Sequence, residues 1–179
     1  MDAPVVEQPT IVTERFALRP VRPSDLGRIE MYAADKRVAM STSRIPHPLP
    51  PGVIDAFIER AMKPEREEDV WVMDGGAPDG TEVMGVISLT HLDRNQSEVG
   101  YWVAPPFWNT HLASDAVTAL VAANPLDNDT MFASVFHDNP ASAKVLTNAG
   151  FQYLGDAEIF SLARDAAVPT WTYSLRLKT

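Results

Sequence analysis

The chain has 179 residues, of which 45% are hydrophobic, enough for one compact domain with its own core. It contains no cysteine, which excludes disulfides, thiolate metal ligands and a cysteine nucleophile, and predicts a reducing, cytoplasmic location. The formal net charge of -9 argues against nucleic acid as a partner, because phosphate binding draws on clustered lysine and arginine. The sequence shows neither a signal peptide nor about 20 consecutive apolar residues, so we expect no membrane segment.

The first third of the chain predicts a strand and two helices around a proline-rich loop. Alternation over Arg15–Arg19 predicts a half-buried strand, and a turn and then a helix follow between Pro20 and about Lys36. Four prolines between Ser43 and Gly52 exclude a helix or central strand, so we predict an ordered loop of the kind that borders binding sites. Apolar residues at helical spacing from Val53 to Met62 predict the second helix.

The middle of the chain is predicted to be rich in strands. We interpret the charged segment Glu65–Asp69 as a solvated loop and Asp74–Gly80 as a turn. The turn Asp93–Gln96 makes the last two strands of this region an antiparallel hairpin. The three predicted strands are Val70–Met73, Val83–Leu89 and Glu98–Val103.

The last third predicts two helices and three strands. Residue types mark both ends of the helix that starts at Asn139. Asparagine is a favoured N-cap, Pro140 is suited to the first turn, and Gly150 is suited to the left-handed residue that ends the helix. No internal repeat or linker is visible. The predicted elements in order are a helix at Leu112–Val121, a strand at Met131–Phe136, a helix at Asn139–Gly150 and strands at Phe151–Leu162 and Thr170–Leu177.

Three motifs, in this order, carry a family resemblance: Thr13-Glu-Arg-Phe-Ala-Leu-Arg-Pro20, Glu98-Val-Gly-Tyr-Trp102, and Asn139-Pro-Ala-Ser-Ala-Lys-Val-Leu146 with Ala149-Gly-Phe151. On these motifs the chain resembles, over nearly its whole length, the GNAT superfamily of acetyl-CoA-dependent N-acetyltransferases, in particular the branch that includes the ribosomal-protein alanine N-acetyltransferases. The resemblance implies a single α/β domain over residues 1–179. Its central mixed, mostly antiparallel, twisted sheet would have about six to seven strands flanked by about four helices.

The resemblance also implies how acetyl-CoA would bind. The strand Glu98–Val103 would splay from its neighbour, so that backbone groups near Trp102 and Val103 pair with the pantetheine arm and polarise the thioester carbonyl. Asn139 would contact the pantetheine, and Ser142 would hydrogen-bond the sulfur of the leaving thiol. Backbone N–H groups and a helix dipole would hold the pyrophosphate without lysine or arginine. The residues of that loop and helix start are Asn109, Thr110, His111, Leu112, Ala113 and Ser114.

The chain departs from the family pattern in this pyrophosphate loop. The superfamily has Gln or Arg, two residues, Gly, one residue, then Gly or Ala, where this chain has Pro106, Asn109 and His111. Asparagine tolerates the left-handed region, whereas histidine adds a ring where the ligand would lie. His111 therefore either donates to a phosphate oxygen or blocks the site. The second reading corresponds to a non-catalytic acyl-CoA-binding or ligand-sensing protein on the same fold.

Catalysis of amine acetylation needs a base for the amine and a stabilised leaving thiolate. Glu98 is the first candidate base, acting directly or through water; alternatively it is an exposed polar residue or only a contact for the substrate ammonium. His91 and His137 are fallback bases. Ser142 is the candidate partner of the thiolate, and the alternative is that Asn139 and Ser142 serve only as a helix cap and a first-turn residue.

The acceptor side is less defined by the sequence. The loop Arg44–Pro51, Trp71 and the turn after Leu89 would border an acceptor groove if the family layout holds. We therefore expect acetyl transfer by direct attack of a primary amine, on a peptide N-terminus or a small molecule, with no metal. The acceptor's identity and the oligomeric state, including a homodimer, stay open. Four aromatic residues would shape the acyl channel or belong to the core: Tyr101, Trp102, Phe107 and Trp108.

Overall fold

The computed structural model describes residues 8–76 and 82–178, so most of the turn expected at Asp74–Gly80 lies outside the described residues. The first half of the chain forms β1 (Ile11–Val12), β2 (Ala17–Pro20), a 3-10 turn η1 (Pro23–Asp25), α1 (Leu26–Ala33), α2 (Lys36–Ser41), α3 (Val53–Ala61), β3 (Glu68–Asp74) and β4 (Val83–Leu92). The second half forms β5 (Gln96–Val103), a 3-10 turn η2 (Pro105–Phe107), α4 (Leu112–Ala123), β6 (Thr130–Phe136), α5 (Pro140–Asn148), β7 (Gln152–Ser161) and β8 (Ala166–Arg176).

The strands form one mixed sheet in the order β1-β2-β3-β4-β5-β6-β8-β7. Neighbours pair antiparallel except β5 and β6, which pair parallel with α4 as the crossover between them. The predicted mostly antiparallel sheet is confirmed, and the part of the chain that the structure describes holds eight strands and five α-helices. The expected first helix ends at Ala33, and the additional helix α2 follows it. The Asp35 carboxylate caps α2 by accepting from the Arg37 N–H.

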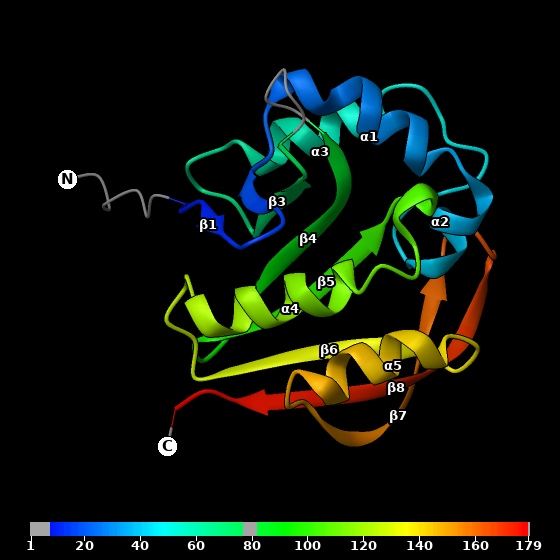
Figure 1. Cartoon of the computed structure of the whole chain (residues 1–179). Helices are drawn as coiled ribbons and strands as arrows, with labels where there is room; N and C mark the ends of the chain where they lie inside the picture. The colour runs from blue at the N-terminus through cyan, green and yellow to red at the C-terminus, as the bar shows by residue number, and fades with distance from the viewer. Residues whose placement is uncertain (1–7, 77–81, 179) are drawn as a thin grey trace.

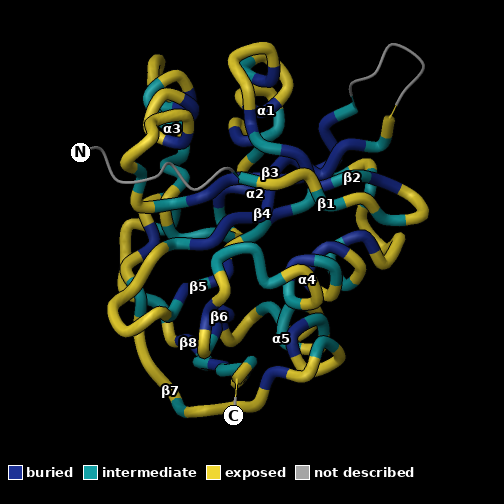
Figure 2. Tube along the Cα trace, turned by 90° about the vertical axis from the view of Figure 1, so that its left-hand side faces the viewer, coloured by how far each residue is buried: buried dark blue, intermediate teal, exposed yellow. Residues whose placement is uncertain are grey.

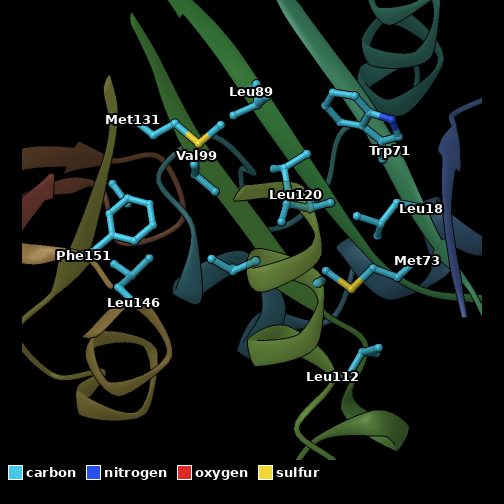
Figure 3. Packing of buried hydrophobic residues seen from close by; sticks show 14 of the residues in the cluster. Leu18, Trp71, Met73, Leu89, Val99, Leu112, Leu120, Met131, Leu146 and Phe151 are labelled. Atoms are coloured by element: carbon cyan, nitrogen blue, oxygen red, sulfur yellow. The ribbon is translucent and has the colours of Figure 1, made fainter. Parts of the chain in front are cut away.

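The helices cover the two faces of the sheet in two groups. Helices α4 and α5 lie on one face, in front of the sheet in Figure 1, and α1, α2 and α3 lie on the other. Alternate side chains of each strand therefore enter different cores. The larger core joins α4 and α5 to the sheet around Leu18, Met73, Leu120 and Met131 (Figure 3). The second core lies beneath α1 and α3 and includes Trp102.

Helix α5 shows how closely local sequence determines the elements around the site. The Asn139 side chain accepts a hydrogen bond from the Ser142 N–H at 3.3 Å, and Pro140 occupies the first turn. Gly150 follows the helix with a φ of 100°, which glycine adopts without strain. All three predicted end signals are confirmed, and they fix Ser142 in the first turn of α5.

The charged segment before β3 differs from the sequence-based expectation. The interpretation of Glu65–Asp69 as a solvated loop is wrong at its end, because β3 begins at Glu68 and Asp69 is buried. The Asp69 carboxylate accepts from the Arg66 side chain and lies 3.5 Å from the His91 ring. A buried carboxylate is tolerated here because it is paired on both sides.

The β7–β8 turn closes back onto α2, as the right-hand side of Figure 1 shows. The Leu162 N–H donates to the Ser43 carbonyl at 3.0 Å, and the Arg164 guanidinium donates to the Met40 carbonyl at 2.9 Å. Arg164 also binds the Asp138 carboxylate just before α5. These contacts join the proline-rich loop, the start of α5 and the β7–β8 turn into one frame.

Within residues 8–76 and 82–178, the helices are all too short or too polar to cross a bilayer. The burial map in Figure 2 shows that exposure is greatest along β7, which forms one edge of the sheet.

Candidate active site

The site begins where β5 and β6 separate. Among the described residues these strands pair only over Gln96–Glu98 against Thr130–Phe132, and Figure 1 shows them diverging beyond that point. The Ala104 N–H donates to the Met84 carbonyl at 2.8 Å, on the β4 side. Because backbone groups alternate in direction along an antiparallel strand, Trp102 also directs its N–H and carbonyl toward β4. Its contribution to the gap therefore comes from its side chain.

The residues between these positions direct their backbone groups into the gap. By the same alternation they are Val99, Tyr101 and Val103. The Val103 carbonyl accepts a hydrogen bond from the Trp108 indole N–H at 2.7 Å, which is consistent with this direction. An extended ligand such as the pantetheine arm would find backbone donors and acceptors along this edge of β5.

A cavity of about 570 Å³ occupies the gap and continues under the proline-rich loop. It receives side chains from both faces of the sheet, because the separated strands no longer divide the two faces. Glu98 and Trp102 reach it on the α1–α3 side, and Tyr101, Asn139 and Ser142 reach it on the α4–α5 side. The structure thus brings together the sequence-predicted base, Glu98, and the sequence-predicted thiol partner, Ser142.

Glu98 is half-buried in this cavity. Burial raises the pKa of the Glu98 carboxyl above its ordinary value, the positive charge of Arg44 lowers it, and the negative charge of Glu68 raises it. A carboxylate with a raised pKa is a stronger base than an exposed one. In the described part of the chain, the Glu98 carboxylate makes no hydrogen bond, so it is free to contact a ligand.

Glu68 was missed as a site residue in the sequence, because it was read as part of a solvated loop. It lies in register with Thr90, which lies in register with Glu98, so the three side chains form a row across β3, β4 and β5. The Glu68 Oε2 accepts from Arg44 at 3.2 Å, from Ser88 at 3.2 Å and from Thr90 at 3.1 Å. Arg44 also donates to the Thr90 hydroxyl at 3.3 Å. Of the loop Arg44–Pro51, which was predicted to border an acceptor groove, Arg44 and Ile45 line the cavity.

Ser142 meets Tyr101 at the other side of the cavity. The two hydroxyl oxygens lie 2.5 Å apart in a hydrogen bond. Burial raises the pKa of Tyr101 to about 12, and its hydrogen bond with Ser142 works against this shift. Tyr101 therefore keeps its proton at neutral pH. The pair can present a hydroxyl donor to a sulfur atom while the phenol holds the serine oxygen in place.

The loop before α4 has the backbone of a glycine-rich turn without its glycines. Asn109 and His111 both have a φ of 62°, in the left-handed region. His111 is the residue before α4, and its side chain makes no capping hydrogen bond. The first-turn N–H groups of Leu112, Ala113 and Ser114 have no helical partners in an α-helix, so they are available to an anion.

Two cations brace this loop at its ends. The Arg15 guanidinium donates to the Thr110 carbonyl at 3.1 Å and to the Asp115 carboxylate at 2.5 Å. The Arg37 guanidinium lies 5.2 Å above the Trp108 ring. Both contacts are exposed and each contributes little to stability. They connect the loop to the segment before β2 and to α2, and the charge of Arg15 is balanced by Asp115.

Three other sequence-predicted residues lie away from the cavity. Trp71 is fully buried in the α4-side core and donates its indole N–H to the Pro9 carbonyl, so the expectation that it borders the acceptor groove is wrong. His91 faces the buried Asp69, and His137 stacks on Trp171 with ring centroids 4.6 Å apart. Neither histidine lies near Glu98 in the described cavity lining.

The four aromatic residues of the expected acyl channel fall into two groups, one inside and one outside the described lining of the cavity. Tyr101 and Trp102 line the cavity, whereas Phe107 and Trp108 lie outside its described lining. Within the described ranges, no group of three or more histidine, aspartate or glutamate residues is arranged to hold a metal ion. The groups that the cavity offers to a ligand include a half-buried carboxylate, a pair of hydroxyls and an open strand edge.

Comparison with known proteins shows the family of the chain. The acetyltransferase (GNAT) domain family matches residues 15–152, which is more than half of the chain, and the chain therefore belongs to this family. The N-acetyltransferase YoaA of Bacillus subtilis (strain 168), named as uncharacterized, is 29% identical over 101 residues. That match covers 54% of this chain and 57% of YoaA, so the chain spans about half the length of this curated relative.

Solved structures show the same fold at low sequence identity. The spermidine N-acetyltransferase from Vibrio cholerae, in complex with CoA and spermine, superposes with a TM-score of 0.77 at 13% identity, over 92% of this chain and 97% of the other. The ribosomal-protein-S5-alanine acetyltransferase from Vibrio fischeri superposes with a TM-score of 0.76 at 19% identity, over 94% and 97% of the two chains. Structural neighbours thus include a ribosomal-protein alanine acetyltransferase.

Proposed function

We propose that this chain is an acetyl-CoA-dependent N-acetyltransferase that transfers an acetyl group to a primary amine by direct attack. One observation carries the proposal: Glu98 and Ser142 enter the same cavity from opposite faces of the sheet, at the gap between β5 and β6. A base on one side and a thiol partner on the other are what the reaction needs. The GNAT family membership supports acetyl transfer to amines in general.

The residues present fit coenzyme A. The backbone of Val99, Tyr101 and Val103 faces the gap, where it would pair with the pantetheine arm. The uncapped start of α4 would hold the pyrophosphate, with Arg15 beside the loop. Asn139 lines the cavity at the start of α5 and would contact the pantetheine. The bound cosubstrate supplies an activated acetyl group.

The chain's own residues would then move the protons. Glu98 accepts the proton that the amine loses as its nitrogen attacks the carbonyl carbon, directly or through water. The Ser142 hydroxyl donates a hydrogen bond to the sulfur as the carbon–sulfur bond breaks, and Tyr101 holds the serine oxygen. A thiol leaves readily, because its pKa is about 8.5, so Ser142 need not become a strong acid.

The proposed family branch, acceptor, location and partners are supported by structurally similar proteins and by the composition of the chain. The ribosomal-protein alanine branch is supported by the shared fold and by the motifs from Glu98 and from Asn139. The acceptor is proposed as a peptide N-terminus or a small-molecule amine, and the neighbour solved with spermine supports the second. We further propose a single domain over residues 1–179, a cytoplasmic location suggested by the absence of cysteine, and neither nucleic acid nor a membrane as partner. A homodimer is an open proposal.

The test is release of free thiol from acetyl-CoA when primary amines are added. The unaltered chain should release thiol in proportion to acetylated amine, and Glu98→Gln should lower kcat at least tenfold, because positioned general bases typically contribute that much or more. The matched control is Glu14→Gln, an exposed carboxylate near β2, which should leave turnover unchanged. Turnover that survives in Glu98→Gln would exclude Glu98 as the base.

A second candidate function is kept because of one observation. Asn109 and His111 stand where the family pattern has glycine or alanine, and both are in the left-handed region. If the His111 ring blocks the pyrophosphate, the chain is a non-catalytic acyl-CoA-binding or ligand-sensing protein. Calorimetric titration with acetyl-CoA and the thiol-release assay together separate the two functions. Micromolar binding that His111→Gly weakens, together with thiol release, supports the enzyme. Binding without thiol release supports the acyl-CoA-binding candidate, and binding that appears only in His111→Gly supports a ligand sensor whose pyrophosphate site is blocked.

A further inference from the structure

The α-helical wall of the cavity is apolar and partly exposed. Ile45, Val53 and Phe57 line the cavity from the proline-rich loop and α3, and all three are only partly buried. Ile29 and Ile54 line the same wall and are buried behind them. When the hydrocarbon of a ligand covers an apolar wall of this kind, apolar surface is removed from water, and this favours binding of the ligand.

The row of side chains across β3, β4 and β5 offers one position for a cation. Farther along the lining, Arg60 and Lys63 stand beside Glu65 and Glu67, so the charges of that segment balance one another. Glu68 and Glu98 carry two negative charges, and Arg44 neutralises one of them through its contact with Glu68. The same Glu68 oxygen accepts from Ser88 and Thr90, so Glu68 is already satisfied by the chain. Glu98 makes no hydrogen bond within the described residues. A single ammonium beside Glu98 would balance the charge of the row.

Arg44 also argues against a second cation on the acceptor. Its side chain is 64% exposed, and its guanidinium donates to Glu68 and to Thr90, the residue that lies between Glu68 and Glu98 in the row. A polyamine bound at Glu98 would bring its next ammonium close to this guanidinium, and like charges repel. To remove the repulsion, the acceptor would have to displace Arg44 from Glu68. The part of the cavity at this row is thus suited to an acceptor with one positive charge.

We propose that the preferred acceptor is an apolar primary monoamine: its ammonium lies at Glu98 and its hydrocarbon group lies against Ile45, Val53 and Phe57. This inference rests on the proposed acetyltransferase function and names the substrate class for the same site. Each methylene that becomes buried on the wall raises the specificity constant about fourfold, because its transfer from water is worth about 0.8 kcal/mol. A chain of four such methylenes therefore gives about a hundredfold preference or more.

The experiment compares three amines under acetyl-CoA saturation: hexylamine, ethanolamine and spermidine. The expected result is a kcat/KM for hexylamine at least about a hundredfold above that for ethanolamine and also above that for spermidine. Turnover of spermidine or ethanolamine at an equal or higher kcat/KM overturns the proposal and leaves the acetyltransferase function intact.

Two variants test the apolar wall itself. Phe57→Ala should lower the ratio of hexylamine to ethanolamine kcat/KM about tenfold or more, and Val53→Thr, which keeps the side-chain shape, should lower it in the same direction. Met31→Ala is the matched control, because Met31 is an exposed apolar residue of α1 outside the described lining. The proposal is overturned if the correctly folded Val53→Thr and Met31→Ala proteins show the same ratio.

A binding measurement separates failure of this inference from failure of the proposed function. Hexylamine and ethanolamine are titrated into the protein saturated with coenzyme A, with no acetyl group to transfer. Tighter binding of hexylamine, lost in Val53→Thr, supports the inference even if no amine is turned over. Equal binding of the two amines overturns it, whatever the turnover assay shows.

Discussion

The first turns of α4 and α5, on the same face of the sheet, are completed in different ways, and of the two it is α5 whose start lines the described cavity. In α5 the chain caps itself, because the Asn139 side chain accepts from the Ser142 N–H. In α4 the preceding residue, His111, is in the left-handed region and its side chain caps nothing. The comparison shows how one fold builds a fixed position and a ligand position from the same element. The capped turn holds Ser142 in place, and the uncapped turn leaves its N–H groups to an anion.

The two carboxylates of the row repeat this contrast on the other face of the sheet. Glu68 is bonded by Arg44, Ser88 and Thr90, and so belongs to the frame of the cavity. Glu98 has no such partner in the described chain, and burial raises its pKa. Groups that the chain satisfies hold the site together, and groups that it leaves unsatisfied are those that we expect to act on ligands.

The largest expected effect comes from placing a negative charge in the uncapped turn. Ser114→Asp should weaken acetyl-CoA binding about a hundredfold, because a carboxylate and the pyrophosphate would compete for the same N–H groups and repel each other. Calorimetric titration measures the change. Ala141→Asp, at an exposed position in the first turn of α5, is the control and should bind nearly normally. Similar losses in both variants would remove the distinction between the two helices.

Removing the Asn139 cap from the first turn of α5 should lower the stability of the protein. Asn139→Ala should lower the free energy of unfolding by about 1 kcal/mol and Tm by about 2–4 °C, because the first turn of α5 loses its side-chain cap. Thermal unfolding followed by circular dichroism gives the shift. Asn148→Ala, at the other end of α5, removes an exposed side chain and should change Tm much less. An unchanged Tm in Asn139→Ala would show that the cap is dispensable.

Replacing His111, the left-handed residue before α4, with glycine should change the free energy of unfolding by a smaller amount, and should raise it. His111→Gly relieves about 1–2 kcal/mol of backbone strain but makes the unfolded chain more flexible, so the net gain is about 0.5–1 kcal/mol. The same unfolding measurement should give a slightly higher Tm. His111→Ala keeps the strained backbone and serves as the control, with no gain. A lower Tm for His111→Gly would mean that the imidazole makes a stabilising contact.

The smallest expected effect concerns the pH dependence of the two carboxylates. Loss of activity at low pH follows protonation of Glu98. Arg44 lowers the pKa of Glu98, so Arg44→Gln should raise that pKa and move the acid limb of kcat/KM to higher pH. Glu68 raises the pKa of Glu98, so Glu68→Gln should move the limb to lower pH. Profiles of kcat/KM against pH for both variants test this, and shifts in the same direction would contradict it.

The sequence identifies much of this site because its signals are local. Asn139, Pro140 and Gly150 predict the ends of α5 from the chemistry of each residue alone. The alternation and hairpin turn around β5 place Glu98 on a strand. The family motifs add what Glu98 and Ser142 would do. None of this required knowledge of which strands are neighbours.

The errors arise where sheet register decides the outcome. Glu68 reads as part of a charged loop, and only its pairing with Thr90 on β4 brings it into the row with Glu98. Trp71 sits in a strand that is buried on both faces, so period-two alternation could not tell which core it enters. His91 follows Thr90 on β4 and therefore points to the opposite face from Glu98.

The frame that closes the cavity also has a consequence for the order of folding. The contact between Arg164 and the Met40 carbonyl joins residues 124 positions apart in the chain. Contacts of such long range pay a large loop-closure entropy before they form, and they form after local structure in most folding transitions. We therefore expect β-hairpins and helices to appear first and the enclosed cavity last. Nascent chains would complete the site only after β8 has been synthesised.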